Sequence, residues 1–327
     1  MQKLGRKFLK LFLLFPAWFR LGNFKWAYRL AEENFSQHQY NGLSVKDGDL
    51  VADATGIVLT DEIYYRLKGG LKYWAPFAQY KGIGYFGMKQ GELITTVDGI
   101  SFRVDHNGSL FILDEIFAER LYDLRVEEDL VVVDVGMNVG VATLFFASWP
   151  NVKAVFGYEP LPDTFGQAKH NFSMNPSLSP KIMPVLSGIS DYNGKISVPA
   201  AVPGSAVFST DPTFLAAHGM NSGPTVEVDI VQIGGVLENI RQQYPGVRVL
   251  LKLDCEGEEY RIMDYLSANR YMDMISVVAL EWHVKGYQTL CDLLKAHHFS
   301  IFNLGRKDID PPVGMIYAFN MKTTSDA

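Results

Sequence analysis

The chain has 327 residues, 48% of them hydrophobic and 20% charged, a balance that predicts a globular protein with a substantial core. Its formal net charge is −6, so it lacks the excess of basic residues that would neutralise the phosphates of a nucleic acid. The two cysteines, Cys255 and Cys291, form neither a zinc pattern nor a disulfide framework, and we expect a cytoplasmic protein.

Residues 1–19 begin with basic side chains and continue with apolar ones. Lys10 interrupts the apolar run, no small-residue cleavage site follows it, and the stretch Leu11–Phe15 is far too short to span a bilayer. We therefore expect neither a signal peptide nor a membrane span here. Two alternatives remain: a helix docked on its own domain or on a second subunit, and an interfacial helix lying on a membrane surface.

A helix is expected over Arg20–Gly42, and an aromatic, glycine-rich stretch follows at Thr60–Tyr85. Its rings suit stacking against a sugar, although packing as a structural cap is the commoner role of such clusters. Residues 92–113 alternate and contain two turn signals, Asp98-Gly99 and Asn107-Gly108, which predict antiparallel hairpins.

We place a domain boundary near Val126. Residues 1–125 are expected to form a helical, aromatic and hairpin region that serves as a cap, a dimerisation surface or part of the acceptor site. Residues 126–327 alternate between strand and helix patterns, and these predict an α/β domain with a mostly parallel sheet.

The stretch that organises this second domain begins with a buried strand at Leu130–Val135. A turn containing Gly136 and Gly140 follows, then a helix, and a second buried strand ends at Glu159. Glycine tolerates positive φ and lets a ligand approach the backbone closely. A strand, a glycine turn, a helix and a strand with a terminal acid form the minimum unit that holds a nucleoside against a parallel sheet.

The acids and the glycine spacing indicate which nucleoside binds. The turn lacks both the G-x-G-x-x-G of dinucleotide binders and the G-x-x-x-x-G-K-[ST] of phosphate loops. Asp134 would repel a pyrophosphate but can accept hydrogen bonds from a cationic ligand, and Glu159 can take both hydroxyls of a ribose. The pattern therefore favours a positively charged nucleoside, a description that S-adenosylmethionine fits. The alternative is a structural unit with solvent-facing acids.

Two loops can complete a ligand site. The first, Gly188–Gly194, lies at the carboxyl end of a strand, where ligands bind in open parallel sheets. Ser190 and Asp191 in it are candidates for the adenine amino group, with a solvated turn as the alternative. The second, Ala200–Pro224, is long enough to close over an acceptor, and His218 in it is either a pocket residue or, more commonly, a surface one.

Acids also crowd the end of the strand expected at Val247–Asp254. Asp254 and Glu256 fall at the carboxyl edge of the sheet, where they can face a sulfonium and its methyl group or orient an acceptor hydroxyl. Glu258 and Glu259 begin the next helix, and carboxylates there suit the positive end of the helix dipole.

The strand expected at Ile275–Leu280 brings a histidine to the same edge. His283 can take a proton from a hydroxyl, because its unperturbed pKa lies near neutrality, and Glu281 can fix its tautomer or bind the acceptor. The alternative is a structural pair that caps the strand. We assign no metal, although Asp254, Glu256 and Glu281 are oxygen donors of the kind that magnesium binds.

Four blocks of sequence occur in a fixed order: D-V-G-M-N-V-G (Asp134–Gly140), Y-E-P (Tyr158–Pro160), L-K-L-D-C-E-G-E-E (Leu251–Glu259) and L-E-W-H (Leu280–His283). Together they resemble the FkbM family of S-adenosylmethionine-dependent methyltransferases, over roughly residues 126–319. The resemblance implies a Rossmann-like class I fold with a mostly parallel seven-stranded sheet and helices on both faces. It also implies methyl transfer to a hydroxyl of a sugar, glycolipid or secondary metabolite.

From pattern and resemblance together, we expect two sets of site residues. The cofactor set is Asp134, Gly136, Met137, Asn138, Gly140, Glu159, Pro160, Ser190 and Asp254. The catalytic set is Glu256, Glu281 and His283. We expect a small-molecule acceptor and no nucleic acid, with a homodimer and a membrane surface at residues 1–20 as further partners to test. Two other function classes remain, a non-catalytic binding or scaffold protein and a nicotinamide-dependent oxidoreductase.

Overall fold

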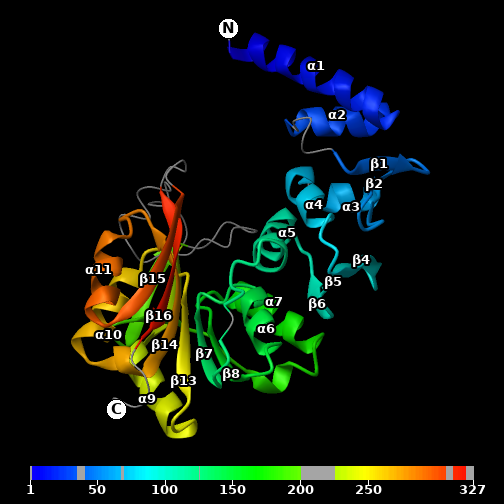
Figure 1. The fold of residues 1–327 in the computed structure, drawn as a ribbon. Helices are drawn as coiled ribbons and strands as arrows, with labels where there is room; N and C mark the ends of the chain where they lie inside the picture. Colours follow the sequence, from blue (N-terminus) through cyan, green and yellow to red (C-terminus); the bar gives the residue numbers. More distant parts are fainter. Residues whose placement is uncertain are drawn as a thin grey trace. The chain divides into compact units, whose positions relative to one another are not determined.

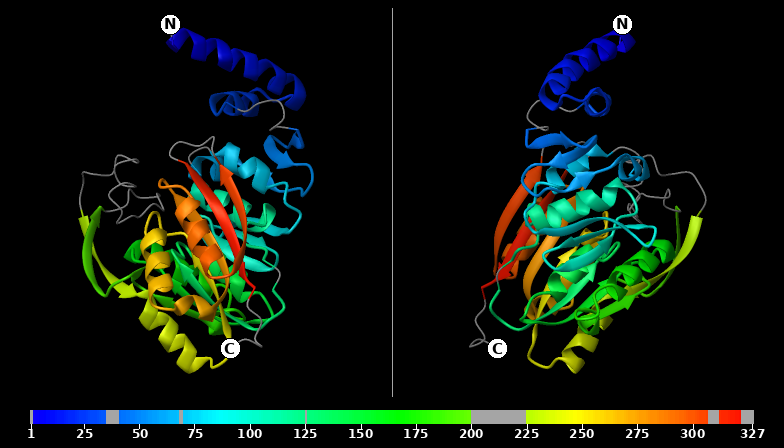
Figure 2. Two further views of the ribbon diagram at one scale, coloured as in Figure 1. Left: turned by 60° about the vertical axis from the view of Figure 1, so that its left-hand side comes forward. Right: turned by 90° about the vertical axis from the view of Figure 1, so that its right-hand side faces the viewer.

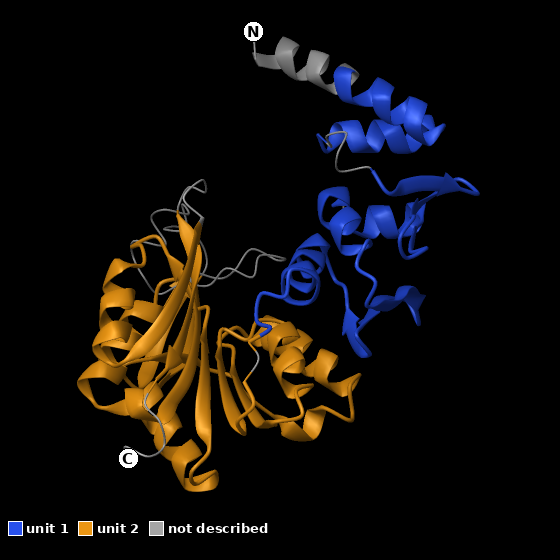
Figure 3. Cartoon of the chain, in the orientation of Figure 1, with its two compact units in different colours: residues 1–123 blue, residues 124–327 orange. Residues whose placement is uncertain are grey.

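The computed structural model describes residues 2–34, 41–67, 70–124, 126–199, 225–306 and 312–321. Figure 1 shows its ribbon. The chain divides into two compact units, residues 1–123 and residues 124–327 (Figure 3). We describe each unit by itself.

The first unit combines short helices with two small antiparallel sheets. Its helices are α1 (Gln2–Leu21), α2 (Phe24–Glu32), α3 (Asp61–Arg66), α4 (Leu71–Phe77) and α5 (Asn107–Leu113), with a π-helical turn at Asp114–Ala118. One sheet holds β1 (Leu43–Lys46), β2 (Asp49–Ala52) and β3 (Val58–Leu59). The other holds β4 (Ile83–Lys89), β5 (Glu92–Val97) and β6 (Ile100–Arg103).

One of the two predicted hairpin turns is confirmed. Asp98 and Gly99 both have positive φ and connect β5 to β6, as a two-residue hairpin requires. The prediction of a hairpin at Asn107-Gly108 was wrong, because these residues begin helix α5. His106 caps this helix by accepting a hydrogen bond from the backbone N–H of Gly108 at 3.0 Å, and such a cap offers the backbone an alternative to a turn.

The second unit is built on a seven-stranded sheet in the order β15-β16-β14-β13-β7-β8-β9. Its strands are β7 (Leu130–Val135), β8 (Val152–Tyr158), β9 (Ile182–Val185), β13 (Arg248–Leu253), β14 (Ile275–His283), β15 (Phe299–Arg306) and β16 (Val313–Asn320). Strand β16 pairs antiparallel with both β14 and β15, and the other pairs are parallel. The mostly parallel seven-stranded sheet predicted from the sequence is confirmed.

Helices cover both faces of this sheet, as predicted (Figures 1 and 2). On one face lie α6 (Val141–Ala147) and α7 (Pro162–Ser173), and on the other lie α9 (Ile233–Gln243), α10 (Glu259–Ala268) and α11 (Gln288–Ala296). Short 3₁₀ turns occupy Ser179–Lys181 and Tyr271–Met274. Because both faces are covered, β7 is buried along its whole length and reads as an unbroken apolar run apart from Asp134.

A smaller sheet of β10 (Gly188–Ser190), β11 (Gly194–Pro199) and β12 (Thr225–Gln232) adjoins the carboxyl end of β9 in the chain. The two extra strands expected on either side of residues 200–224 are confirmed. The loop expected at Gly188–Gly194 is partly a strand, because β10 pairs in parallel with β12. His218 and the segment 200–224 lie outside the described residues.

The strand order reverses between β7 and β13. From β7 the chain proceeds outward to β8 and β9, and it later returns to place β13 on the other side of β7. Ligands of open α/β sheets bind in the crevice at the carboxyl ends of such neighbouring strands. Here the two ends are tied together, because the N–H of Asp254 donates to the carbonyl of Val135 at 3.2 Å.

Candidate active site

The turn after β7 depends on its glycines. Gly136, Asn138 and Gly140 all have positive φ, at 76°, 52° and 81°. A Cβ atom at Gly136 would lie 1.9 Å from the carbonyl oxygen of Asp254, and one at Gly140 would lie 2.5 Å from the ring of Phe172. The backbone of the turn therefore passes so close to its neighbours that no side chain fits at either glycine.

The backbone N–H groups of the turn are all used inside the chain. Each N–H group donates one hydrogen bond, and the five bonds are Gly136 N to Tyr158 O (3.1 Å), Met137 N to Tyr158 O (2.9 Å), Asn138 N to Glu159 Oε2 (3.2 Å), Val139 N to Asn138 Oδ1 (2.7 Å) and Gly140 N to Met137 O (2.9 Å). A phosphate-binding loop instead points its N–H groups at the ligand. This arrangement agrees with the sequence-based view that the turn does not bind a pyrophosphate.

Asp134 lies beneath the turn rather than at its surface. Its side chain is 0% exposed, accepts a hydrogen bond from Thr143 Oγ1 at 2.6 Å, and lies 3.0 Å from Lys252 Nζ. We expected this carboxylate to receive hydrogen bonds from the cofactor, and the structure differs because those bonds come from the chain. Asp134 can reach a ligand only indirectly, through Lys252 and the backbone of the turn.

Lys252 connects the ends of β7 and β13. Its buried ammonium donates to the carbonyls of Gly136 at 2.7 Å and Val135 at 3.3 Å, and it lies 3.5 Å from Asp254 Oδ2. Burial lowers the pKa of Lys252, but the charges of Asp134 and Asp254 outweigh this effect and hold it above its ordinary value. The lysine is therefore charged and fixes both the turn and the carboxylate of Asp254.

Glu159 directly follows β8 beside the turn and is buried. Its two carboxylate oxygens accept from the N–H groups of Asn138 at 3.2 Å and Leu161 at 3.0 Å. These two hydrogen bonds lower the pKa of Glu159, but burial has the larger effect and raises the pKa to about 7. Met137 and Pro160, which we also expected at the cofactor, flank this carboxylate in the chain and are themselves buried.

Ser190 is buried at the end of β10 and contacts an acid that the sequence did not connect with it. Its hydroxyl lies 2.7 Å from Glu258 Oε2 and 3.1 Å from Asp191 Oδ1, and its single proton can serve only one of them at a time. Arg261 holds Asp191 at 2.9 Å. These polar groups form a closed cluster at the end of the small sheet.

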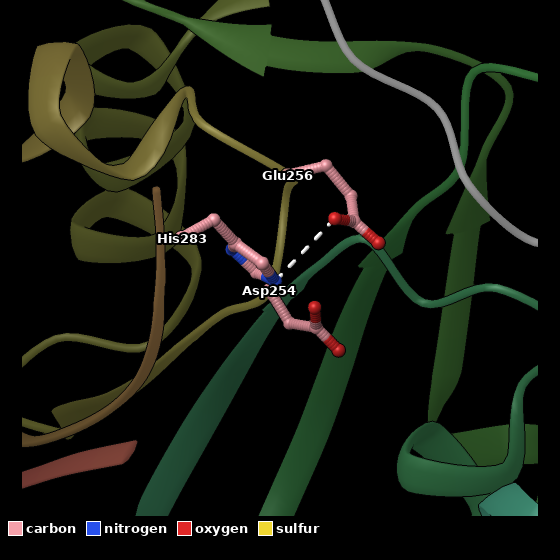
Figure 4. A group of neighbouring side chains, drawn as sticks. All are labelled: Asp254, Glu256 and His283. Atoms are coloured by element: carbon pink, nitrogen blue, oxygen red, sulfur yellow. Dashed lines mark ion pairs between the residues drawn. The ribbon is translucent and has the colours of Figure 1, made fainter. Parts of the chain in front are cut away.

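Three side chains of the predicted site converge at the carboxyl edge of the large sheet. Figure 4 shows Asp254, Glu256 and His283 turned toward one another. His283 Nε2 lies 3.4 Å from Glu256 Oε2, and its Nδ1 lies 3.2 Å from Glu259 Oε1. The carboxylate on Nδ1 is thus that of Glu259, where the sequence suggested Glu281.

Glu259 begins α10, as predicted, but its side chain turns back into the protein. It is fully buried and accepts hydrogen bonds from the N–H groups of His283 at 2.9 Å and Gly257 at 2.7 Å. It therefore holds both the backbone and the ring of His283, which fixes the orientation of the imidazole.

The protonation of the histidine follows from its neighbours. Burial lowers the pKa of His283, but the hydrogen bond with Glu259 and the charge of Glu256 outweigh it and raise the pKa to about 10. Burial raises the pKa of Glu256 to about 8, with His283 opposing the shift and Asp254 adding to it. The two groups interact strongly and hold at least one proton between them at neutral pH.

Glu281 lies two residues before His283 on β14, and alternation along the strand places both side chains on the same face. Burial, with a contribution from the Glu281 charge, raises the pKa of Tyr317 on β16 to about 12. The charge of Glu281 thus acts both on Tyr317 of β16 and on Glu256 of the cluster.

The described residues contain one group able to hold a metal ion, namely Asp254, Glu256 and His283, whose ligand atoms lie within 4.8 Å of one another. Two cationic groups of the chain already contact these acids, since Lys252 lies near Asp254 and His283 lies near Glu256. The expectation of a site without a metal stays a prediction.

Sequence reasoning assigned no role to Lys252 or Thr143, and it gave the carboxylate of Glu259 only a role at the start of a helix. A signal for Lys252 was present, because a charged residue inside the apolar run of a buried strand must find partners. Thr143 and Glu259 gave no comparable signal, since their roles depend on which elements pack against them.

The family model described as "Methyltransferase FkbM domain" matches residues 134–300, slightly more than half of the chain. The chain belongs to the FkbM family of methyltransferases. The match runs from the end of β7 to the start of β15 and so includes the glycine turn, Lys252 and the His283 cluster.

Three proteins similar to this FkbM methyltransferase are distant from it in sequence. Methyltransferase 1 of Beauveria bassiana is 26% identical over 217 residues, which cover 62% of the chain and 85% of that protein. Hexuronic acid methyltransferase AglP of Haloferax volcanii is 28% identical over 167 residues, 50% of the chain and 60% of AglP. Among solved structures, an FkbM methyltransferase from Methylobacillus flagellatus KT has a TM-score of 0.42 and 14% identity, over 65% of the chain and 52% of that protein.

Family membership overturns two of the alternatives left open by the sequence, the nicotinamide-dependent oxidoreductase and the non-catalytic protein. It also implies S-adenosylmethionine as the methyl donor of this FkbM methyltransferase. Among the residues that the structure describes, no helix is both long enough and apolar enough to cross a membrane.

Proposed function

We propose that this FkbM methyltransferase is an O-methyltransferase that acts on a hydroxyl of a small molecule, namely a sugar, glycolipid or secondary metabolite. The observation that carries the proposal is the proximity of two groups of residues. The glycine turn contacts the backbone of Asp254, and Glu256, which pairs with His283 of β14, lies two residues further along the chain from Asp254. A donor-binding turn and a proton-accepting pair thus meet at one edge of the sheet.

The residues of the turn fit S-adenosylmethionine better than a nucleotide with phosphates. The N–H groups of the turn are already engaged, so a phosphate would find no donors there. The carboxylate of Glu159 can accept the ribose hydroxyls, and the partly exposed acid Asp254 attracts a positive charge. Gly136, Gly140 and Asn138 would support the donor through the shape of the backbone.

S-adenosylmethionine, when bound, supplies the methyl carbon, which bonds to the acceptor oxygen as its bond to sulfur breaks. The acceptor hydroxyl must also lose its proton. We assign that proton to Glu256 in its ionised form, which is the minor form at neutral pH because burial raises its pKa to about 8. The charge of protonated His283, 3.4 Å away, favours this ionised form. His283 then positions the Glu256 carboxylate, and Glu281 borders the acceptor.

A saccharide acceptor is supported by the relative named hexuronic acid methyltransferase. A hexuronic acid offers both hydroxyls and a carboxylate. A carboxylate is already ionised at neutral pH and needs no proton acceptor, whereas a hydroxyl does. The presence of the Glu256–His283 pair therefore favours a hydroxyl as the methylated group.

The roles of the two units are also part of the proposal. Residues 126–327 would bind the methyl donor, and residues 1–125 would serve as a cap, a dimerisation surface or part of the acceptor site. The aromatic residues between Thr60 and Tyr85 support a structural cap in part, because Trp74 and Phe77 are fully buried.

The test uses S-adenosylmethionine with a radioactive methyl group and a panel of hexose, hexuronic acid and hydroxylated lipid acceptors. Methylation of a hydroxyl, lost in Glu256→Gln but with donor binding retained, is the expected result. Methylation of a carboxylate that survives Glu256→Gln would refute the assignment of the acceptor group. Failure of the protein to bind S-adenosylmethionine or S-adenosylhomocysteine by calorimetry would refute the donor site.

A further inference from the structure

The charge of the chain is distributed unevenly. Residues 1–31 contain seven basic residues and no acidic one, so they carry +7, and the remaining residues must carry −6 − 7 = −13. The basic residues are Lys3, Arg6, Lys7, Lys10, Arg20, Lys25 and Arg29. Asp61 engages Lys25 and Arg29, at 2.9 and 2.7 Å, and the other five all lie in α1. The first helix is therefore strongly cationic within an acidic protein.

The same segment exposes large aromatic side chains. We call this set the aromatic row: Phe12, Phe15, Trp18 and Phe19 of α1, with Phe24 and Tyr28 of α2. Phe12 is 77% exposed and Phe19 is 84% exposed. The row continues from one helix to the next, because the ring centroid of Trp18 lies 5.8 Å from that of Phe24, and Phe24 lies 6.4 Å from Tyr28.

The aromatic row is not the face by which these helices join their unit. In α2, the residues Trp26, Ala27, Leu30 and Ala31 are buried, and in α1, Ala17 and Leu21 are buried. Trp26 also donates from its indole nitrogen to the carbonyl of Gly48 at 2.9 Å, which fixes α2 to the turn between β1 and β2. The helical pair thus has one face packed in the unit and a separate apolar face that is exposed.

We propose that α1 and α2 dock on an anionic membrane surface, with the aromatic row inserted at the level of the headgroups. Aromatic side chains are enriched at this level of a bilayer, and basic residues beside them are attracted to anionic lipids. The helices lie on the surface and do not cross it, since no described helix is suited to span a bilayer. The sequence left two alternatives for residues 1–19, a helix docked on protein and a helix on a membrane surface. In this proposal both hold, because packing and membrane contact use different faces of the α1–α2 pair.

Charge favours a lipid surface over a second copy of the chain. In a symmetric dimer formed through the aromatic row, the same patch would face itself, and the cationic helices α1 would be brought together. The net charge of α1, +5 on each copy, would then oppose association. An anionic lipid surface supplies the opposite charge.

The test is cosedimentation of the full chain with vesicles of phosphatidylcholine alone and of phosphatidylcholine mixed with phosphatidylglycerol. We expect binding to the mixed vesicles that weakens as salt is added and is at least about tenfold weaker on the neutral vesicles. The double variant Phe12→Ser, Phe19→Ser should reduce binding to the mixed vesicles by about tenfold or more. A matched control is Phe302→Ser, because Phe302 is a 64% exposed phenylalanine of the second unit.

Affinity for S-adenosylhomocysteine and the far-ultraviolet circular dichroism spectrum should be equal in all these proteins, because the substituted side chains are exposed and lie outside the donor site. Equal binding of wild type to both kinds of vesicle, or equal binding of wild type and the double variant, would overturn the proposal. So would absence of vesicle binding together with a dimer, measured by light scattering, that the double variant abolishes. That outcome would assign the aromatic row to a second copy of the chain.

Discussion

Replacing Lys252 with methionine tests whether the buried ammonium holds the site together. Methionine preserves most of the length and apolar surface of the side chain but removes the charge and the donors. The variant would leave Asp134 buried opposite an apolar group, and the carbonyls of Val135 and Gly136 would lose their donor. Both the stability of the sheet and the position of the turn depend on these contacts.

The size of the effect follows from the distances. At 3.0 Å and an effective dielectric constant of about 20, the attraction between Lys252 and Asp134 is worth about 5 kcal/mol. The variant no longer has a buried ammonium to desolvate, which offsets part of that loss, so we expect a net destabilisation of about 3–5 kcal/mol. The pKa of the lysine lies above its ordinary value, so its contribution is fully present at neutral pH and is lost only as pH rises through that raised pKa.

The assay is urea unfolding followed by far-ultraviolet circular dichroism, combined with calorimetric titration of S-adenosylhomocysteine. The double variant Asp134→Asn, Lys252→Met is the control, because it removes the uncompensated carboxylate. We expect it to recover about 1–3 kcal/mol of the lost stability, while ligand affinity stays at least about tenfold below wild type since the carbonyl of Gly136 still lacks its donor. If Lys252→Met unfolds within about 1 kcal/mol of wild type and binds the ligand equally well, the proposed role of the lysine is refuted.

Four further outcomes are expected. Gly136→Ala should abolish binding of S-adenosylhomocysteine, because its Cβ would lie 1.9 Å from a backbone oxygen, whereas Gly166→Ala, with open space in α7, should be neutral or about 0.5–1 kcal/mol more stable in urea unfolding. His283→Ala should lower turnover by about 100-fold or more in the methyl-transfer assay and leave donor affinity nearly unchanged. Affinity for S-adenosylhomocysteine should rise about tenfold between about pH 6 and pH 8, as Glu159 with a pKa of about 7 loses its proton, and Glu159→Gln should flatten this dependence. Chelation with EDTA should leave turnover unchanged, because Lys252 and His283 already contact the clustered carboxylates.

Each of these outcomes has a clear opposite. Wild-type affinity in Gly136→Ala would mean that the turn does not need its close backbone approach, and full turnover in His283→Ala would remove the histidine from the mechanism. An affinity that does not vary with pH would separate Glu159 from the ribose. Loss of turnover in EDTA, restored by adding back one divalent ion, would show that the site of Figure 4 requires a metal.

The sequence predicted the sheet well because its strands carry strong local signals. The run Leu130–Val135 is apolar at almost every position, as burial on both faces requires, and the observed strand has the predicted bounds. The positions of Gly136 and Gly140 were informative for the same reason, since both have the positive φ that glycine tolerates. Local sequence is sufficient where the backbone itself imposes the requirement.

Other features could not be predicted because they depend on packing between distant segments. Glu259 looked like an ordinary acid at a helix start, and only the approach of β14 brings His283 to its carboxylate. Asp134 looked like a ligand-binding acid because its partner Lys252 lies 118 positions further along the chain. The turn signal at Asn107-Gly108 failed because the cap supplied by His106 favours a helix there.

The saturated hydrogen bonding of the turn at residues 136–140 has a consequence for how a ligand enters. A loop that has no donor left to satisfy has little reason to change shape when the ligand arrives, so its conformational entropy is already lost in the free protein. The folding of the sheet, rather than the binding step, then bears the cost of ordering this loop. Binding of the proposed donor nucleoside therefore needs no rearrangement of this turn, and adaptation to different acceptors must come from other segments of the chain.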